Sequence, residues 1–402
     1  MSTVTRAYRE AGRRGIASGT TGSGTYINGA GPEASSMASP EPFARGVTEM
    51  GIVSPLPHLD PDLKDALRAL SRRGNLASYL NYSAPEGYAP HREAGRIWMQ
   101  RYGAEFSADE ITVCGGSQHA LACAVLSHFR EGQRIACDAY TYPGFKTLAA
   151  MCRIKIVPVP MDAHGMIPSE LDAVCRREEI AGLYVMPAMQ NPTASSMDER
   201  RRDAIADIAS RNDLTVIEDD AFIHSAESPG TPFAARIPER VIYIAGVSKA
   251  LGAGLRVSFV GARGASREKI ARAVMNTSWM TPPLNAEIIS GWIKDGSAEK
   301  TLDAKRREAH ERNRIAKKIF GAADFRSSPC GYYLWLPLRG GVTGSALEKK
   351  LRARGVSVFA AERFAAGSRV EDNAVRLSLV TVKSRGEMTK ALEIVKDMLS
   401  GM

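Results

Sequence analysis

The stretch Ile244–Arg256 (IAGVSKALGAGLR) places a lysine where a buried strand is expected to end. The chain is apolar up to Val247, turns polar at Ser248 and Lys249, and reaches Arg256 seven residues after the lysine. Most lysines lie on the surface without a specific role, but one that is desolvated near other cations becomes nucleophilic. An arginine beside it can donate two hydrogen bonds to a phosphate. The residues at the other strand ends decide whether Lys249 is an ordinary surface lysine or a nucleophile beside a bound phosphate.

Four other predicted strands also end in groups that could do chemistry. Ser117 and Gln118 follow ITVC in a glycine turn that opens a helix, and free N–H groups at a helix start favour an anion. Tyr142 follows RIACD and can stack on a flat ring. Asn191 follows AGLYVMPAM and offers an amide donor, while Asp219 follows LTVIE and needs a partner for its carboxylate. Taken singly, each group also fits a turn, a packing contact or a helix cap.

These groups belong to a region in which strands and helices alternate, from about residue 90 to 290. Such alternation predicts an α/β fold, a doubly wound and mostly parallel sheet with helices on both faces. Ligands of open sheets of this kind bind at the carboxyl ends of the strands. After about residue 300 a long charged helix leads to GYYLWLPL, VSVFAA, AVRLSLV and a final helix, which predicts a smaller α+β C-terminal domain. The expected division is a large domain over 46–295 and a small one over 296–402.

Together the strand ends supply an anion-binding turn, a stacking ring, an amide, a carboxylate, a lysine and an arginine. That is the set needed to hold pyridoxal 5′-phosphate, with its phosphate at the helix start, its ring on the aromatic side chain, its ring nitrogen at the carboxylate and its aldehyde at the lysine. The cofactor predicted from the residues is therefore pyridoxal phosphate.

The order and spacing of seven stretches resemble the fold-type I pyridoxal-phosphate enzymes of the class I/II aminotransferase family. They span residues 82–380: YSAPEGYAPHREA, GGSQHAL, YTYPG, QNPT, IEDDAF, SKALGAGLR and AVRLSL. The resemblance implies a covalent cofactor bond at Lys249, a ring-nitrogen contact at Asp219, a ring-oxygen contact at Asn191 and ring stacking by Tyr142. It implies that the cofactor phosphate is held by Ser117, Gln118, Ser248 and Arg256. It also implies that Tyr82 reaches the phosphate of a neighbouring subunit in a homodimer, and that Arg376 binds the substrate carboxylate.

Two positions depart from the family pattern. Phe222 stands where the family usually has a tyrosine that hydrogen-bonds the ring oxygen, so Asn191 acts alone there or another tyrosine replaces it. Gly246 stands three residues before the lysine, where the family often has serine or threonine, so one phosphate contact is missing. Both departures leave cofactor binding expected and bear on the rate and type of reaction.

The start of the chain resembles part of a different module. TVTRAYREA is similar to the recognition helix of a GntR-type winged helix, and GSGTYI to the wing that follows it. Regulators of the MocR type join such a module through a linker to an aminotransferase-like domain. The interpretation is a partial winged-helix arm over 1–27 and a linker over 28–45, with a disordered basic tail as the alternative. The helices that should precede a recognition helix are absent, so we expect weak nucleic-acid binding.

Composition narrows the class of protein. The chain has 402 residues and a formal net charge of +9, which suits an anionic ligand or a nucleic-acid surface on part of the chain. Its six cysteines form no C-x-x-C pair and predict reduced, buried thiols and no metal site. No membrane span or signal peptide is apparent, so we expect a cytoplasmic protein. The basic run 305–318 is expected to be a solvated helix face.

Two functions from different classes follow. The first is an aminotransferase that moves an amino group between an amino acid and a 2-oxo acid. The second is an effector-sensing domain of a MocR/GntR-type transcription regulator with little or no turnover. Both need Lys249, Asp219 and Arg376, so these residues do not separate them, and the missing half of the DNA-binding module favours the enzyme.

Overall fold

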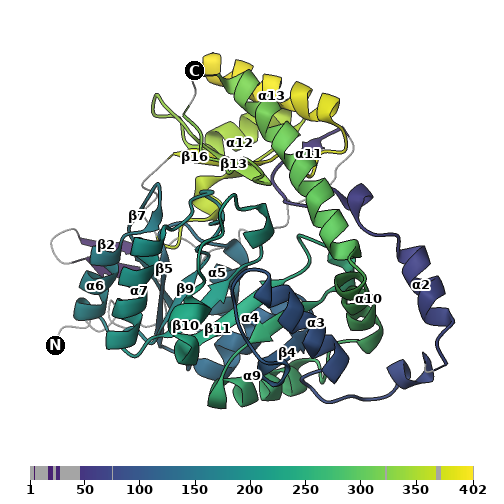
Figure 1. The fold of residues 1–402 in the computed structure, drawn as a ribbon. Coiled ribbons are helices and arrows are strands. Elements are labelled where there is room, and N and C mark those ends of the chain that lie inside the picture. Colours follow the sequence, from purple (N-terminus) through teal and green to yellow (C-terminus); the bar gives the residue numbers. More distant parts are fainter. Residues whose placement is uncertain are drawn as a thin grey trace.

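A seven-stranded sheet forms the centre of the protein in a computed structural model (Figure 1). The structure describes residues 4, 17–20, 24–27, 46–74, 76–321, 324–367 and 373–401. The strand order is β4 (Ile111–Cys114), β12 (Ser258–Gly261), β11 (Val241–Gly246), β10 (Thr215–Asp219), β9 (Gly182–Val185), β5 (Arg134–Asp138) and β6 (Lys155–Val159). β12 is antiparallel to both of its neighbours, and the pairings from β11 through β6 are parallel. The predicted mostly parallel α/β sheet is therefore confirmed.

Helices cover both faces of this sheet, which makes it doubly wound. One face carries α4 (Ser117–His128), which packs on α5 (Pro143–Met151) and α9 (Gly264–Thr277). The other carries α3 (Ala89–Gln100), α6 (Pro168–Arg177), α7 (Glu199–Arg211) and α8 (Phe233–Arg236). The residues of β4, β9, β11 and β12 are all buried, as expected of strands covered on both faces. Two short strands, β7 (Met161–Asp162) and β8 (Gly165–Met166), form a hairpin after β6.

A second, smaller sheet lies in the C-terminal part of the chain. It is antiparallel, in the order β13 (Tyr333–Pro337), β16 (Ala374–Ser378), β15 (Phe359–Ala360), and it is accompanied by α12 (Gly344–Ala353) and α13 (Arg385–Ser400). The segment VSVFAA, expected as one strand, is divided into β14 (Val356–Ser357) and β15. β14 pairs in parallel with β3 (Thr48–Glu49), so the chain just after the linker joins the C-terminal part. The predicted boundary at residues 295/296 stays a prediction.

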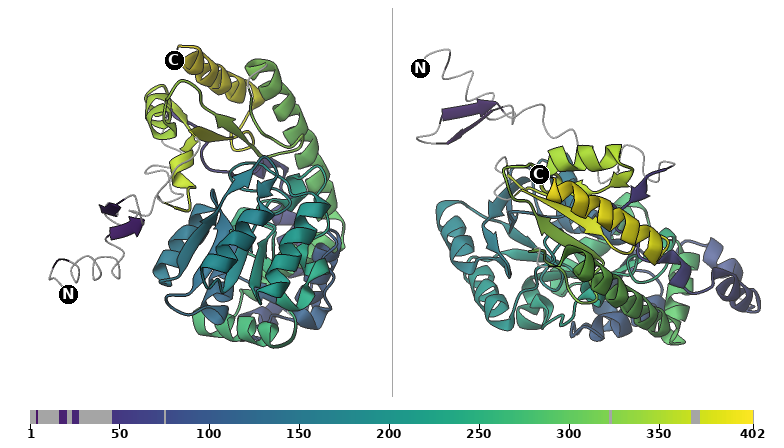
Figure 2. Two further views of the ribbon diagram at one scale, coloured as in Figure 1. Left: turned by 90° about the vertical axis from the view of Figure 1, so that its left-hand side faces the viewer. Right: turned by 90° about the horizontal axis from the view of Figure 1, so that it is seen from above.

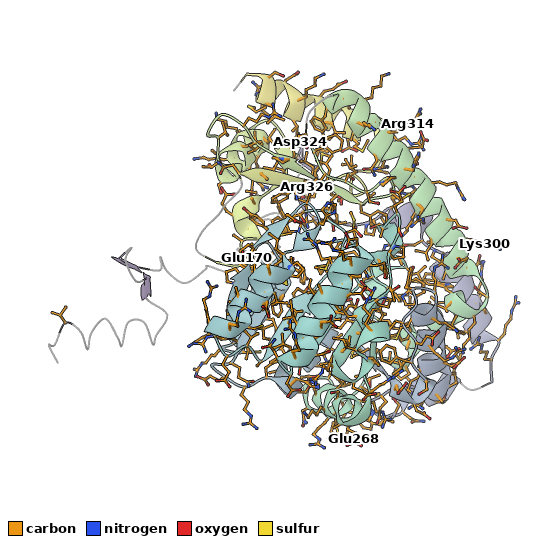
Figure 3. The ribbon with its side chains drawn as sticks, turned by 60° about the vertical axis from the view of Figure 1, so that its left-hand side comes forward. Glu170, Glu268, Lys300, Arg314, Asp324 and Arg326 are labelled. Atoms are coloured by element: carbon orange, nitrogen blue, oxygen red, sulfur yellow. The ribbon has the colours of Figure 1, made fainter. Side chains whose placement is uncertain are left out.

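Helix α11 (Ser297–Phe320) runs from the large sheet to the small one (Figure 2). Its basic residues do not form the uniformly solvated face that was expected. Lys300 and Arg314 do point outward (Figure 3), but Lys305 and Arg312 are each only 1% exposed. Lys305 pairs with Asp60 at 2.5 Å, and Arg312 donates to backbone carbonyls near the start of α13. The expectation was wrong because long basic side chains can bury when their charges find partners.

Further elements complete the described chain. Helices α2 (Leu63–Ser71) and α10 (Pro283–Lys294) pack against each other, and neither was predicted. Near the N-terminus β1 (Ala17–Thr20) and β2 (Gly24–Ile27) form an antiparallel hairpin that includes most of the segment predicted as a wing. The predicted recognition helix, apart from Val4, and the predicted linker lie outside the described residues. No helix in the described part of the chain has the length and apolar character to cross a membrane.

Candidate active site

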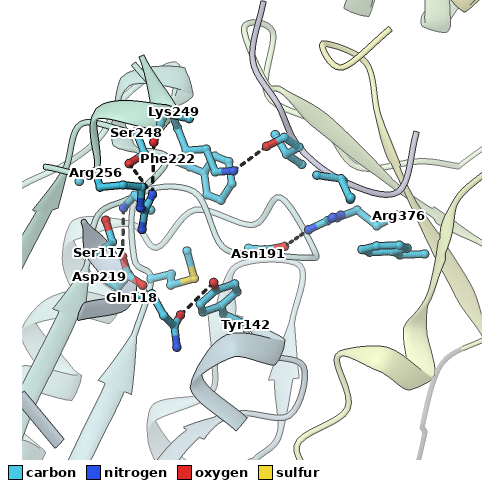
Figure 4. A pocket seen from close by; sticks show the side chains of 17 residues that line it. Ser117, Gln118, Tyr142, Asn191, Asp219, Phe222, Ser248, Lys249, Arg256 and Arg376 are labelled. Atoms are coloured by element: carbon cyan, nitrogen blue, oxygen red, sulfur yellow. Dashed lines mark hydrogen bonds between the residues drawn. The ribbon is translucent and has the colours of Figure 1, made fainter. Parts of the chain in front are cut away.

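A cavity of about 230 Å³ opens at the carboxyl ends of the large-sheet strands, facing β16 of the small sheet (Figure 4). The structure brings nearly all the predicted site residues together there. Those that line it are Ser117, Gln118, Tyr142, Asn191, Asp219, Ser248, Lys249, Arg256 and Arg376. Tyr82 is the exception, because its side chain is 81% exposed and lies 5.6 Å, ring to ring, from Trp279.

The anion-binding turn lies against an arginine. Ser117 begins α4, and Gly116 before it has φ 86°, a conformation that favours glycine. A Cβ atom at Gly116 would also overlap the guanidinium of Arg256, so a larger residue there would displace this side chain. Arg256 itself has φ 51° and donates to Ser248 Oγ at 3.3 Å. The free N–H groups of α4 and this guanidinium thus converge on one point, which suits a phosphate.

Gly246 is explained by the same turn. A Cβ atom built on Gly246 would collide with Ser117 Oγ. The Ser117 hydroxyl therefore occupies the space that a side chain at position 246 would need. Ser117 is already one of the expected phosphate contacts, so the contact missing at Gly246 is not regained.

Lys249 follows β11 and projects into the cavity. Its Nζ donates to the backbone carbonyl of Val53 at 2.5 Å and lies 5.7 Å from the centre of the Phe222 ring. The pKa of Lys249 is lowered to about 8, mainly by burial and also by the charges of Arg376 and Arg256. About a tenth of this amine is therefore neutral at pH 7, and the neutral, nucleophilic share reaches about half at pH 8.

Asp219 ends β10 on the cavity wall. Tyr184 on β9 donates its hydroxyl to Asp219 Oδ2 at 2.8 Å, and the N–H of Ala221 donates to Oδ1 at 3.2 Å. Burial raises the pKa of Asp219 to about 6, although both hydrogen bonds lower it. A buried carboxylate of this kind gains from a cationic partner in the cavity. Tyr184 was not among the predicted site residues, and its signal in the sequence was a phenol inside an apolar strand.

Tyr142 and Gln118 hold each other on the opposite wall. The Tyr142 hydroxyl donates to Gln118 Oε1 at 3.0 Å, and Gln118 Nε2 donates to the carbonyl of Gly144 at 3.1 Å. Gln118 thereby fixes the phenol ring in place.

Phe222 packs edge-on against Tyr333, with the ring centres 5.1 Å apart. The Tyr333 hydroxyl donates to the carbonyl of Gln190 at 3.0 Å. Tyr333 therefore does not replace the missing hydroxyl at position 222.

Arg376 reaches the cavity from β16. It donates to Asn191 Oδ1 at 2.5 Å and to the carbonyl of Gly51, and it lies 4.8 Å from the centre of the Phe364 ring. Burial lowers its pKa to about 10. Among the described residues its Nε has no hydrogen-bond partner. A buried guanidinium with an unused donor is suited to an anionic group that enters the cavity.

The segment after β3 contributes to the site through its backbone. Ile52 and Val53 line the cavity, and the carbonyls of Gly51 and Val53 accept from Arg376 and Lys249. This role was not predicted, because these residues carry no polar side chains. Glu49 fixes the segment by accepting from the N–H groups of Gly51 and Ile52 at 2.6 and 2.9 Å.

The chain resembles proteins of two kinds over most of its length. It is 30% identical, over its full length and 87% of the other protein, to the uncharacterized HTH-type transcriptional regulator YdeF of Bacillus subtilis. It is 28% identical to the 2-aminoadipate transaminase of Thermus thermophilus, over 83% of this chain and 85% of that protein.

Solved structures agree with the fold. An archaeal alanine:glyoxylate aminotransferase superposes with a TM-score of 0.81 at 23% identity, over 88% of this chain and 91% of that one. The Thermus thermophilus α-aminoadipate aminotransferase LysN, complexed with N-(5′-phosphopyridoxyl)-L-leucine, superposes with a TM-score of 0.80 at 25% identity, over 89% and 93%.

These similarities confirm the predicted family, fold, enzyme class and cofactor. The cavity fits pyridoxal phosphate on its own evidence, because it combines an arginine-backed helix start, a buried carboxylate and a buried lysine with a lowered pKa. Residues 55–395 match the family described as aminotransferase class I and II. The chain therefore belongs to the class I and II aminotransferase family, whose members depend on pyridoxal phosphate.

Proposed function

We propose that this protein catalyses transamination between an amino acid and a 2-oxo acid in the cavity around Lys249. The observation that carries the proposal is the position of Lys249, buried among Phe222, Val53 and the charges of two arginines, with a lowered pKa. Lys305, by contrast, is paired with the carboxylate of Asp60.

In this proposal the cofactor's phosphate is held by the N–H groups that open α4, by the Ser117 hydroxyl and by Arg256 and Ser248. Tyr142 supports the ring, and Asn191 donates to the ring oxygen. Pyridoxal phosphate, when bound, supplies an aldehyde that reacts with amines and a ring that withdraws electrons from the substrate carbon. Asp219 keeps the ring nitrogen protonated, and the Tyr184 hydroxyl holds that carboxylate in the required orientation.

Lys249 has two tasks. As a neutral amine it would bond to the cofactor, and its Nζ, when free, would accept and return the proton of the substrate's α-carbon. The carbonyl of Val53, which accepts from its Nζ, fixes the starting position of this flexible side chain. The rings of Phe222 and Phe359 and the side chain of Ile52 limit water around the amine.

Arg376 takes the substrate carboxylate. Its stacking on aromatic rings and its hydrogen bonds to Asn191 and Gly51 hold the guanidinium before any substrate enters. Because the guanidinium is already held in place, substrate binding costs less conformational entropy of this side chain. Because Asn191 contacts Arg376, the same amide links the substrate end of the cavity to the cofactor end.

The test is a spectrum combined with product analysis. Amino acids should convert the yellow protein fully to the pyridoxamine form and release the matching 2-oxo acid, and Lys249→Ala should do neither. The matched control is Lys146→Ala, which removes a partly buried lysine outside the cavity. A spectral change without any 2-oxo acid would contradict transamination and favour the sensing function below.

A second candidate function is effector sensing in a transcription regulator. It is favoured by the similarity to YdeF over the whole chain, which includes the N-terminal arm, and by the β1–β2 hairpin within that arm. We expect DNA binding by this chain to be weak, insensitive to sequence and lost at moderate salt, since the arm offers only scattered arginines to DNA phosphates. A salt titration of DNA affinity tests this. Tight, sequence-specific binding at physiological salt would make the regulator the leading function.

We further propose a homodimer with shared active sites, located in the cytoplasm. Support comes from apolar side chains that the single chain leaves in water: Leu80 is 89% exposed, Tyr82 81% and Trp279 54%. Tyr82 and Trp279 touch each other, so they form one patch. Exposed apolar patches of this kind mark protein interfaces, and a partner seated there would bring Tyr82 toward the cavity of the other subunit.

A further inference from the structure

Two cysteines and a histidine gather behind the anion-binding turn. Cys114 ends β4, and His119 and Cys123 lie one turn apart on α4. Cys123 Sγ is 3.3 Å from His119 Nε2, and the sulfur and nitrogen atoms of the three side chains lie within 4.8 Å of one another. Both cysteines are fully buried. The turn Gly115–Ser117 is thus the short connection between the two sulfur-bearing elements.

The Nε2 side of the His119 ring faces two acceptors, the Thr277 hydroxyl, which donates its own proton to the carbonyl of Ala273, and the more distant Cys123 Sγ. The N–H of Gly115 donates to His119 Nδ1 at 2.9 Å, so the ring proton of the neutral imidazole is on Nε2. Nε2 faces Cys123 Sγ and the hydroxyl of Thr277, which is 2.7 Å away. A metal ion bound at Nε2 would require the proton on Nδ1, where the Gly115 N–H already points. The arrangement therefore suits a thiolate and argues against a metal ion.

The two thiols differ in acidity. Hydrogen bonding from the Cys114 side chain, together with that from His119, lowers the pKa of Cys123 although burial opposes it. The hydrogen bond between the two cysteine side chains, together with burial, raises the pKa of Cys114. The remaining cysteines that show a shift, Cys137, Cys152 and Cys175, have raised pKa values, chiefly because of burial. Cys123 is therefore the most acidic of these thiols, and the thiolate is the form that reacts with oxidants.

We propose that Cys123 and Cys114 are an oxidation site, which a hydroperoxide converts to a disulfide, and that this bond displaces the Gly115–Ser117 turn and weakens binding of the cofactor phosphate. The second half rests on the proposed function of Ser117. Thr277 is exposed and its hydroxyl is 3.8 Å from Cys123 Sγ, so the sulfur lies just beneath the surface for a solute as small as hydrogen peroxide.

The chemistry balances in two steps. The Cys123 thiolate attacks one peroxide oxygen, so a sulfur–oxygen bond forms, the oxygen–oxygen bond breaks, and the departing hydroxide takes a proton to leave as water. The Cys114 thiol then loses its proton and attacks Cys123 Sγ, so the disulfide forms and a second water leaves. Two thiols are oxidised and one peroxide is reduced. A disulfide needs its sulfurs about 2.05 Å apart, so the end of β4 and α4 must shift toward each other.

The first test reads the site without any assay of activity. Trypsin releases residues 102–130 as one peptide that contains both cysteines and no internal lysine or arginine. After treatment of the full-length protein with limiting hydrogen peroxide, this peptide should lose the mass of two hydrogen atoms before other cysteines oxidise. Cys114→Ser should instead trap Cys123 as a sulfenic acid that dimedone labels, and Cys123→Ser should leave Cys114 unmodified.

Several outcomes would overturn the site. The peptide could stay reduced while Cys152 or Cys175 oxidises, or the purified protein could hold one zinc ion per chain that protects both thiols.

The second test measures cofactor affinity. The oxidised wild-type protein should bind pyridoxal phosphate about tenfold more weakly, which is the effect of one lost hydrogen bond to a charged group. Peroxide-treated Cys114→Ser,Cys123→Ser should keep its affinity. A disulfide without a change in affinity would refute the coupling to the phosphate, and the peptide result stands whether or not the protein transaminates.

Discussion

The hydroxyl of Ser117 fills the space in which a side chain at position 246 would begin. Gly246→Ser should therefore force its Cβ atom into the place of the Ser117 hydroxyl and displace the turn that opens α4. We expect the dissociation constant for pyridoxal phosphate to rise about tenfold or more, because overpacking costs about 1–3 kcal/mol.

Removing the Ser117 hydroxyl should relieve this clash. Ser117 Cβ would lie 3.6 Å from the new Cβ, an ordinary contact distance, so Ser117→Ala combined with Gly246→Ser should bind the cofactor better than Gly246→Ser alone. A titration of the cofactor-free protein measures all three variants. If the effects of the two substitutions simply add, the residues do not share the site as described.

Lys249 should be the residue that bonds covalently to the cofactor. Borohydride should fix pyridoxal phosphate on the peptide containing Lys249, and Lys249→Ala should abolish the product. Lys146 is the matched control, since its pKa is also lowered to about 8 by burial while its Nζ donates to a backbone carbonyl outside the cavity. Fixation of the cofactor on Lys146 in the wild type would place the chemistry elsewhere.

The reaction of cofactor-free protein with pyridoxal phosphate should accelerate as the pH rises through about 8, because the neutral amine of Lys249 is the nucleophile. The charge of Arg376 lowers the pKa of this amine. Arg376→Gln should therefore raise the pKa and move the profile to higher pH. Stopped-flow absorbance measures the rate at each pH, and a shift to lower pH would contradict the electrostatic assignment.

Asp219→Asn should reduce turnover on the order of a hundredfold, by analogy with other lost electrostatic groups, because an amide does not keep the ring nitrogen protonated. Tyr184→Phe should cost less, about tenfold, since it removes one hydrogen bond to the carboxylate. It should also raise the pKa of Asp219. Single-turnover kinetics separate these effects from cofactor affinity, and equal losses for both variants would point to a structural role for Asp219.

Mixed dimers test whether active sites are shared. A Tyr82→Ala subunit paired with a Lys249→Ala subunit should have one cavity with both lesions and one with neither. Activity should therefore return when the two inactive proteins are mixed and exchange subunits. Light scattering that shows a monomer at working concentration, or no recovery on mixing, would contradict the proposed arrangement.

The strands that carry the site were predictable because buried parallel strands are short apolar runs ending in polar residues. RIACD and ITVC coincide with β5 and β4. The segment 51–53 was not predictable, because it acts through backbone carbonyls that any sequence would possess. The split of VSVFAA also escaped prediction, because it arises from pairing with β3, more than 300 residues earlier in the chain.

The pairing of β3 with β14 sets a limit on how far the chain can be shortened from its N-terminus. Removal of residues 1–45 would leave β3, Glu49 and the carbonyls of Gly51 and Val53 in place. Removal of ten further residues would strip Lys249 and Arg376 of these acceptors and open the edge of β14, leaving two buried cations without compensation. A chain cut near residue 45 should therefore be a workable protein for crystallisation, whereas one cut at residue 55, where the family match begins, should not.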